Sequence, residues 1–146
     1  MYQSRELLRA WLHRLEGLAM AIANAPVDRE SDLVRLFYDL MASVPDATLL
    51  GGLAQPDPAW IETLLAAKAP DSAALAFIAD DAGFCVSRGG DGNHMASVVL
   101  SGASEEATAT GPTLALACLG ALALAVADAP MAVLARAQMQ DVVSLH

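Results

Sequence analysis

The chain has 146 residues, of which 55% are hydrophobic and 5% aromatic, and its formal net charge is −9 at pH 7. This length is typical of one domain that builds its core without disulfide or metal cross-links, so we expect a single domain over residues 1–146. The acidic balance argues against binding to nucleic acid or to a membrane surface, because both present negative charge to a binding protein.

Two helices are expected in the first third of the chain, forming a helical hairpin over residues 1–45. The first covers residues 4–24, and its apolar residues recur at alternating spacings of three and four. The second follows Pro26, uses Asp28 as its N-cap and stops before Pro45. The expected apolar faces are Leu8, Trp11, Leu15, Leu18 and Ile22 in the first helix, and Leu33, Leu36, Phe37, Leu40, Met41 and Val44 in the second.

The second part, residues 57–146, is expected to begin with a short helix after an irregular connection over residues 46–55. Asp57 followed by Pro58 supplies an N-cap and a proline at the first helical position. We expect this helix to run to about Lys68 and to end before Pro70-Asp71.

An antiparallel meander of three or four strands should follow this helix. Its strands are expected over residues 74–79, 84–88 and 94–100, since these short apolar runs are separated by the turn sequences DDAG and GGDGN. Residues 105–110 alternate polar with small residues and could add an edge strand. Strands that follow and precede helices in this order predict the α+β class.

No charged residue occurs between Glu106 and Asp128, which predicts a buried helix over residues 112–127 that covers the sheet. Its strictly apolar part is shorter than the ~20 residues of a membrane-spanning helix. The bulky residues Leu116, Leu119, Leu122 and Val126 are expected on the sheet side. The small residues Ala117, Cys118, Ala121 and Ala125 gather on the opposite side, where a helix or a second subunit could approach. A final amphipathic helix is expected over residues 131–143, with Val133, Leu134, Ala137 and Val142.

The sequence EEATATGPTLALACLGALALA, residues 105–125, resembles the C-terminal signature of the phage ABA sandwich domain, a family of small bacterial and phage proteins of unknown function. The sequence WLHRLEGLA, residues 11–19, is similar in style to the opening helix of that family. The resemblance implies a sheet with helices packed on it and a prophage-related origin. It implies no activity.

The most polar cluster of the predicted meander contains Asp80, Asp81, Cys85, Arg88, Asp91 and His94. Its two turns should lie at opposite ends of the middle strand, ~17 Å apart, so their side chains cannot share one metal ion. Arg88, Asp91 and His94 could meet around one turn and are the candidate catalytic residues. No metal site and no cofactor are predicted, since two ligands across a turn do not make a site and no cofactor motif is present.

The cysteines and the N-terminal sequence bear on location. Cys85 and Cys118 are too few for a disulfide framework, and both lie among apolar neighbours where small buried thiols are common, so we expect both to be reduced. Charged residues interrupt the first twenty positions, so the continuous apolar stretch of a secretory signal is absent there. We therefore expect a cytoplasmic protein.

Three functions remain open from the sequence. The first is a structural or interaction protein of prophage type that forms a homo-oligomer through its alanine-rich apolar helices. The second is a peptide- or protein-binding module, similar to an acidic secretion chaperone, that adds a peptide strand beside residues 105–110. The third is a small enzyme built around Arg88, Asp91 and His94.

Overall fold

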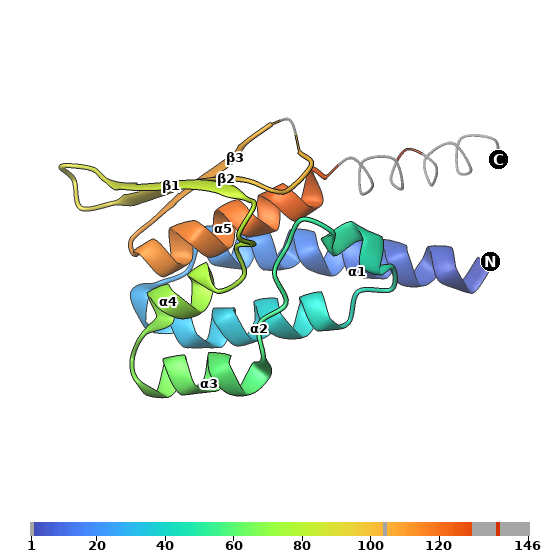
Figure 1. Ribbon diagram of the computed structural model, residues 1–146, viewed down its shortest axis with the longest axis horizontal. Coiled ribbons are helices and arrows are strands. Elements are labelled where there is room, and N and C mark those ends of the chain that lie inside the picture. The colour runs from blue at the N-terminus through green and yellow to red at the C-terminus, as the bar shows by residue number, and fades with distance from the viewer. Residues whose placement is uncertain (1, 104, 130–136, 138–146) are drawn as a thin grey trace.

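The computed structural model describes residues 2–103, 105–129 and 137, and places a three-stranded sheet over a layer of helices (Figure 1). The expected α+β class is confirmed, with an antiparallel sheet and a helix packed on it. In chain order the elements are α1 (Tyr2–Ala23), the 3-10 turn η1 (Val27–Arg29), α2 (Glu30–Ala42), the 3-10 turn η2 (Ala47–Leu50), α3 (Pro58–Ala66), α4 (Pro70–Leu75), β1 (Gly83–Arg88), β2 (His94–Val99), β3 (Ala107–Gly111) and α5 (Leu114–Ala127).

The first two helices follow the apolar spacing of the sequence closely. Trp11 and Leu15 of α1 are buried together with Phe37 of α2, and the indole Nε1 of Trp11 donates a hydrogen bond of 2.7 Å to the carbonyl oxygen of Leu40. This bond satisfies the one polar atom of a buried tryptophan, so α1 and α2 are joined by both packing and a directed contact.

Two details of α2 differ from expectation. Asp28 belongs to η1, where Arg29 N–H donates to the carbonyl of Pro26 at 3.1 Å, so Asp28 does not cap α2. Leu36 is 47% exposed while Val34 is fully buried. The buried side of α2 is therefore rotated toward Val34, and Leu36 lies at its rim.

The segment after α3 corrects the largest sequence expectation. Asp57 caps α3 as predicted, since its carboxylate accepts the Ala59 N–H at 2.8 Å. Pro70, however, begins a helix instead of ending one, so residues 70–75 form α4 where a strand was expected from residue 74. Ala73 and Ala74 are completely buried, and small side chains suit a helix that packs closely against its neighbours.

The rest of that expected strand makes one isolated bridge. Ile78 pairs with Leu53 in antiparallel fashion, and the N–H of Ala54 donates to the carbonyl of Phe77 at 2.9 Å. Gly52 brings this connection close to the end of β2, because a Cβ at Gly52 would lie only 2.8 Å from the Cβ of Leu100.

The sheet has the strand order β1-β2-β3, with both neighbouring pairs antiparallel. Cys85 of β1 lies opposite Ser97, and Ala96 of β2 lies opposite both Val86 and Ala109. The expected edge strand is realised as β3, which makes three strands in the described part of the chain.

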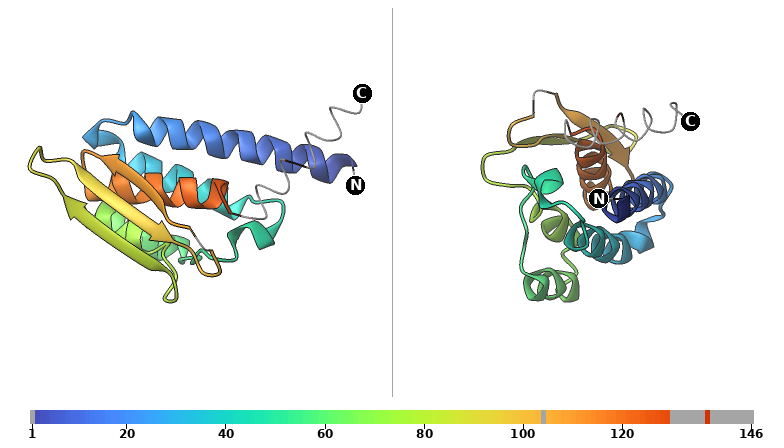
Figure 2. Two further views of the ribbon diagram at one scale, coloured as in Figure 1. Left: turned by 90° about the horizontal axis from the view of Figure 1, so that it is seen from above. Right: turned by 90° about the vertical axis from the view of Figure 1, so that its right-hand side faces the viewer.

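Helix α5 lies between the sheet and the other helices (Figure 2), and its packing partners are β2, β3, α1, α4 and α2. Thr113 caps it by accepting the Leu116 N–H at 3.2 Å, and the carboxylate of Asp71 from α4 accepts the Ala115 N–H at 3.0 Å. Among the residues that the structure describes, no helix is both long enough and apolar enough to cross a membrane.

Both sides of α5 are covered by this chain. The bulky set Leu116, Leu119, Leu122 and Val126 is buried, and so are Ala117, Cys118 and Ala121, while Ala125 is half-buried. The tight approach of α5 to the sheet is made by small residues, since a Cβ on Gly120 would lie 3.0 Å from the Cβ of Ala109. A second subunit is thus not required to bury the small-residue side. The expected final helix over residues 131–143 lies outside the described residues, apart from Ala137.

Candidate functional site

The three candidate catalytic residues lie around the hairpin that joins β1 and β2. Arg88 and His94 are opposite each other in the sheet register, and Asp91 lies in the turn between them. The hairpin therefore brings the three residues to one end of the sheet. None of the three lines either of the two pockets described below.

The carboxylate of Asp91 is engaged by its own turn. It accepts the backbone N–H of Asn93 at 3.0 Å and the side-chain amide of Asn93 at 3.4 Å. Gly89 leaves room for this arrangement, since a Cβ there would lie 2.9 Å from the Oδ1 atom of Asp91. Asp91 thus has the role that aspartate commonly has in turns, in which one carboxylate oxygen accepts a backbone N–H two residues later.

His94 is half-buried, and its Nδ1 atom is buried without a hydrogen-bond partner among the described residues. A general base must lie within hydrogen-bond reach of the proton that it removes. The buried Nδ1 has no such contact with the described residues. The Asp91 carboxylate bonds to Asn93 and not to Arg88 or His94, so the structure shows no hydrogen bond that links the three side chains.

The described residues also hold no cluster of three or more histidine, cysteine, aspartate or glutamate side chains that could bind a metal ion. Both cysteines are free thiols. Cys118 is buried as expected, whereas Cys85 is exposed because it lies on β1, whose residues are all exposed. Burial raises the pKa of the Cys118 thiol to about 12, and the nearby charge of Asp71 adds to this shift. Because the thiolate is the reactive form, Cys118 is unsuited to nucleophilic chemistry at neutral pH.

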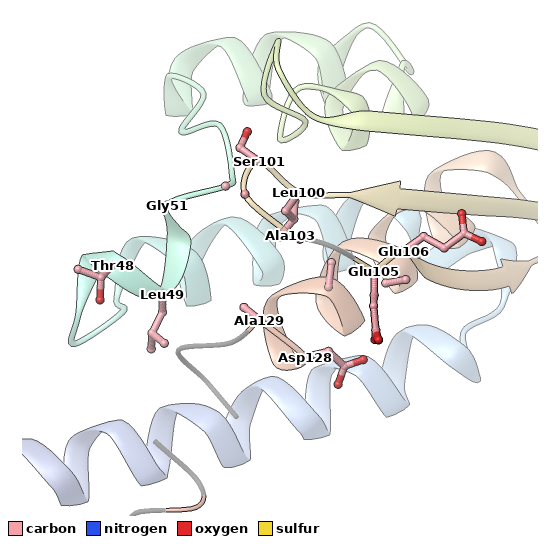
Figure 3. Close-up of a pocket in the computed structure, with 14 residues that line it drawn as sticks. Thr48, Leu49, Gly51, Leu100, Ser101, Ala103, Glu105, Glu106, Asp128 and Ala129 are labelled. Carbon is pink, nitrogen blue, oxygen red and sulfur yellow. The ribbon is translucent and has the colours of Figure 1, made fainter. Parts of the chain in front are cut away.

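The larger pocket has a volume of about 400 Å³ and lies where η2, the connection between β2 and β3, and the end of α5 meet (Figure 3). Leu49, Leu100 and Ala125 contribute apolar surface, and the carboxylates are those of Glu105, Glu106 and Asp128. None of the described residues that line this pocket is basic. Anionic ligands are disfavoured there by the negative charge.

A smaller pocket of about 170 Å³ lies between α2 and α3, where Tyr38, Asp39 and Ile61 are among its lining residues. The Arg35 guanidinium spans it with hydrogen bonds of 2.9 and 3.1 Å to the two carboxylate oxygens of Glu62. The bidentate hydrogen bond holds the pKa of Glu62 below its ordinary value and raises that of Arg35. Arg35 and Glu62 are thus already paired with each other.

Strand β1 is an exposed edge of the sheet. All six of its residues are exposed, and the exposed fractions of Phe84 and Val86 are 52% and 36%. Their opposite neighbours on β2, Val98 and Ala96, are each only 1% exposed. The difference arises because α5 packs against β2 and β3, while β1 lies at the side of the sheet away from α1 (Figure 2).

Comparisons with protein-family models, with curated proteins and with solved structures found no significant match to this chain. The resemblance of residues 105–125 to the phage ABA sandwich domain therefore stays a prediction.

Sequence patterns did not indicate β1 as an exposed surface or the pocket beside η2. The strand itself was predicted, but the run FCVSR has the composition of a covered strand. The residues within a strand do not indicate whether a helix covers it, because that depends on packing between elements far apart in the sequence. The start of α4 did carry a signal, because proline is favoured at the first position of a helix.

Proposed function

We propose that this protein is a small structural or interaction protein that binds other polypeptide strands along the edge of β1. The observation that carries this proposal is a six-residue edge strand in which every residue is exposed, Phe84 and Val86 among them. An extended strand can add to such an edge through backbone hydrogen bonds, while the apolar side chains contribute buried area.

The composition of β1 supports a binding role. Natural proteins protect edge strands with lysine, proline, bulges or covering segments, because an open edge pairs with other chains. The strand GFCVSR contains neither lysine nor proline, and its single charge is on Arg88 at its end. Within the described residues, β1 pairs only with β2.

The other edge of the sheet, β3, is less suited to this role. It consists of Ala107, Thr108, Ala109, Thr110 and Gly111, so it offers no large apolar side chain to a partner. Helix α1 also packs near β3. Ile22 of α1 and Ala109 of β3 both lie next to Gly120 of α5, at 3.6 and 3.0 Å from a Cβ placed there. If the protein is instead a chaperone-like module that binds a foreign peptide, the peptide strand would therefore add to β1, not beside residues 105–110.

A cytoplasmic location belongs to the same proposal. Cys85 and Cys118 are both free in the structure, and an exposed free thiol such as that of Cys85 suits a reducing compartment.

The proposal is tested with a labelled peptide of residues 82–89 that carries serine in place of Cys85. We expect fluorescence anisotropy to report saturable binding to the intact protein. Val86→Lys should weaken binding at least tenfold, because a lysine at the edge disfavours strand addition. Met95→Lys is the matched control, since Met95 is 44% exposed on the same hairpin but belongs to the central strand β2.

Equal loss of binding in both variants would point to a general effect of charge, and no binding by the unmodified protein would remove the proposal. Circular dichroism of each variant verifies that the fold is kept.

A further inference from the structure

We infer that the strand added to β1 is β1 of a second copy of this chain, paired antiparallel about a two-fold axis that passes beside Val86. This inference rests on the proposed function of the β1 edge and names the partner. The resulting sheet would be continuous across the two copies, with six strands in the order β3-β2-β1-β1-β2-β3.

The hairpin geometry identifies which backbone groups of β1 are free. Gly89 N–H donates to Asn93 O at 2.8 Å, so Gly89 and Asn93 form a hydrogen-bonded pair. Such pairs alternate along an antiparallel ladder with pairs that exchange no hydrogen bonds. Going back along β1, residues 87, 85 and 83 therefore bond to β2, while the N–H and C=O groups of Phe84, Val86 and Arg88 point outward.

These outward groups select a register. A two-fold axis at Val86 pairs Val86 with itself and Phe84 with Arg88 of the second copy, so all three outward residues of each strand are used. With two bonds for each such pair, about six backbone hydrogen bonds would join the copies. An axis at Cys85 instead pairs Phe84 with Val86 and leaves Arg88 opposite Ala82, which lies before the strand.

The side chains are complementary in the Val86 register. Phe84, Val86 and Arg88 share one face of β1, because alternate residues of a strand point the same way. In the register Phe84 lies opposite Val98 and Val86 opposite Ala96, so this face continues the buried face of β2. A two-fold axis perpendicular to the sheet keeps these faces on one side. Each Phe84 ring would then lie across from an Arg88 guanidinium, a pairing that favours contact between the cation and the aromatic face.

The charges of the strand agree with this arrangement. Arg88 is exposed and makes no ion pair with the described residues, whereas Arg29 and Arg35 each have a carboxylate partner. Strand β1 contains no acidic residue. The paired strands would therefore place no two carboxylates opposite each other. The net charge of −9 makes the two copies repel at long range, and because salt screens this repulsion, added salt should strengthen the association.

Disulfide trapping tests the register directly. In the Val86 register, Cys85 lies opposite Ser87 of the second copy as a pair without hydrogen bonds, with Cα atoms about 4.5 Å apart. That separation lies within the range of disulfides. We expect the Ser87→Cys variant to form a covalent dimer rapidly under mild oxidation, while the unmodified chain does not. The double variant Cys85→Ser, Ser87→Cys is the control and should remain uncrosslinked.

Rapid cross-linking of the unmodified chain through Cys85 would overturn the Val86 register, because it requires Cys85 at the axis. Slow cross-linking of every variant would overturn the pairing itself. Sedimentation at protein concentrations from about 1 μM to about 200 μM covers the dissociation constants of weak dimers. It should show a dimer that Val86→Lys weakens at least tenfold and Met95→Lys leaves intact.

The outcomes separate this inference from the proposed function. A chain that stays monomeric at every concentration but binds the labelled peptide refutes the second copy and keeps strand addition at β1. A dimer that Val86→Lys leaves intact uses another surface and refutes the inference. Hydrogen exchange gives an independent readout, since the amides of Phe84, Val86 and Arg88 should gain protection with concentration while exposed turn amides do not.

Discussion

Gly120 of α5 and Ala109 of β3 are in such close contact that a Cβ placed on Gly120 would lie 3.0 Å from the Cβ of Ala109 and 3.6 Å from Cγ2 of Ile22. The helix, the sheet and α1 meet at this point. The two smallest residue types therefore allow α5 to lie close to the sheet at this point.

We predict that Gly120→Ala lowers the free energy of unfolding by about 1 kcal/mol. Overpacking costs about 1–3 kcal/mol, and the better helix propensity of alanine returns about 1 kcal/mol. Urea denaturation measures the change. Adding Ala109→Gly should recover part of the loss beyond additivity, because it removes the facing methyl group. A stabilised Gly120→Ala protein would contradict the close contact.

Trp11 is 2% exposed, and its Nε1 donates to Leu40 O at 2.7 Å. Trp11→Phe should cost about 2–3 kcal/mol of unfolding free energy, because it removes both buried area and the hydrogen bond. The Leu40 carbonyl also accepts from Ser43 N–H at 3.2 Å, which limits the loss. Trp60→Phe, at a residue that is 53% exposed, is the control and should change stability by less than about 0.5 kcal/mol.

Asp71 joins α4 to the start of α5 by accepting the Ala115 N–H at 3.0 Å. We predict that Asp71→Ala destabilises the protein by about 1 kcal/mol, as the loss of a helix cap does. Asp71→Asn keeps an acceptor oxygen and should cost less. Thermal unfolding of the two variants side by side decides the point, and equal losses would show that the charge matters and the hydrogen bond does not.

The two thiols should differ in reactivity. At pH 8 we expect a thiol reagent to modify Cys85, which is exposed, and to leave Cys118 unmodified until the protein is denatured. Burial raises the pKa of Cys118 from 9.0 to about 12, with a further contribution from Asp71, so its thiol stays protonated when folded. One reactive group in the native protein and two in denaturant is the expected count; rapid native labelling of Cys118 would contradict its burial.

The same shift gives stability a pH dependence. The unfolded chain loses the Cys118 proton near pH 9 and the folded chain only near pH 12, so the contribution of this thiol is complete below pH 9 and decreases between these values. Denaturant unfolding between about pH 8 and about pH 10.5 should show this decline, and Cys118→Ala should reduce it. An equal decline in the variant would assign the effect to other groups.

The predicted helices show how far local patterns reach. The three-and-four spacing of α1 and the uncharged run of α5 each extend over at least three turns, so their period is evident in the sequence alone. The strand predicted over residues 74–79 was wrong, because a six-residue apolar run fits both a strand and a buried helix. These residues form a helix because α4 packs against α5 and α2, and that packing buries Ala73 and Ala74 in the core.

Local sequence patterns predict the α+β class, the cap at Asp57, the turn at Gly89–Asn93 and the near-complete burial of α5, since each is indicated by residues close together along the chain. No such pattern predicts that α5 packs on β2 and β3 and leaves β1 uncovered. That outcome depends on packing between elements that are far apart along the chain, such as α5 and β2, and a local sequence pattern does not specify such packing. Phe84 and Val86 are exposed because α5 packs on the neighbouring strands.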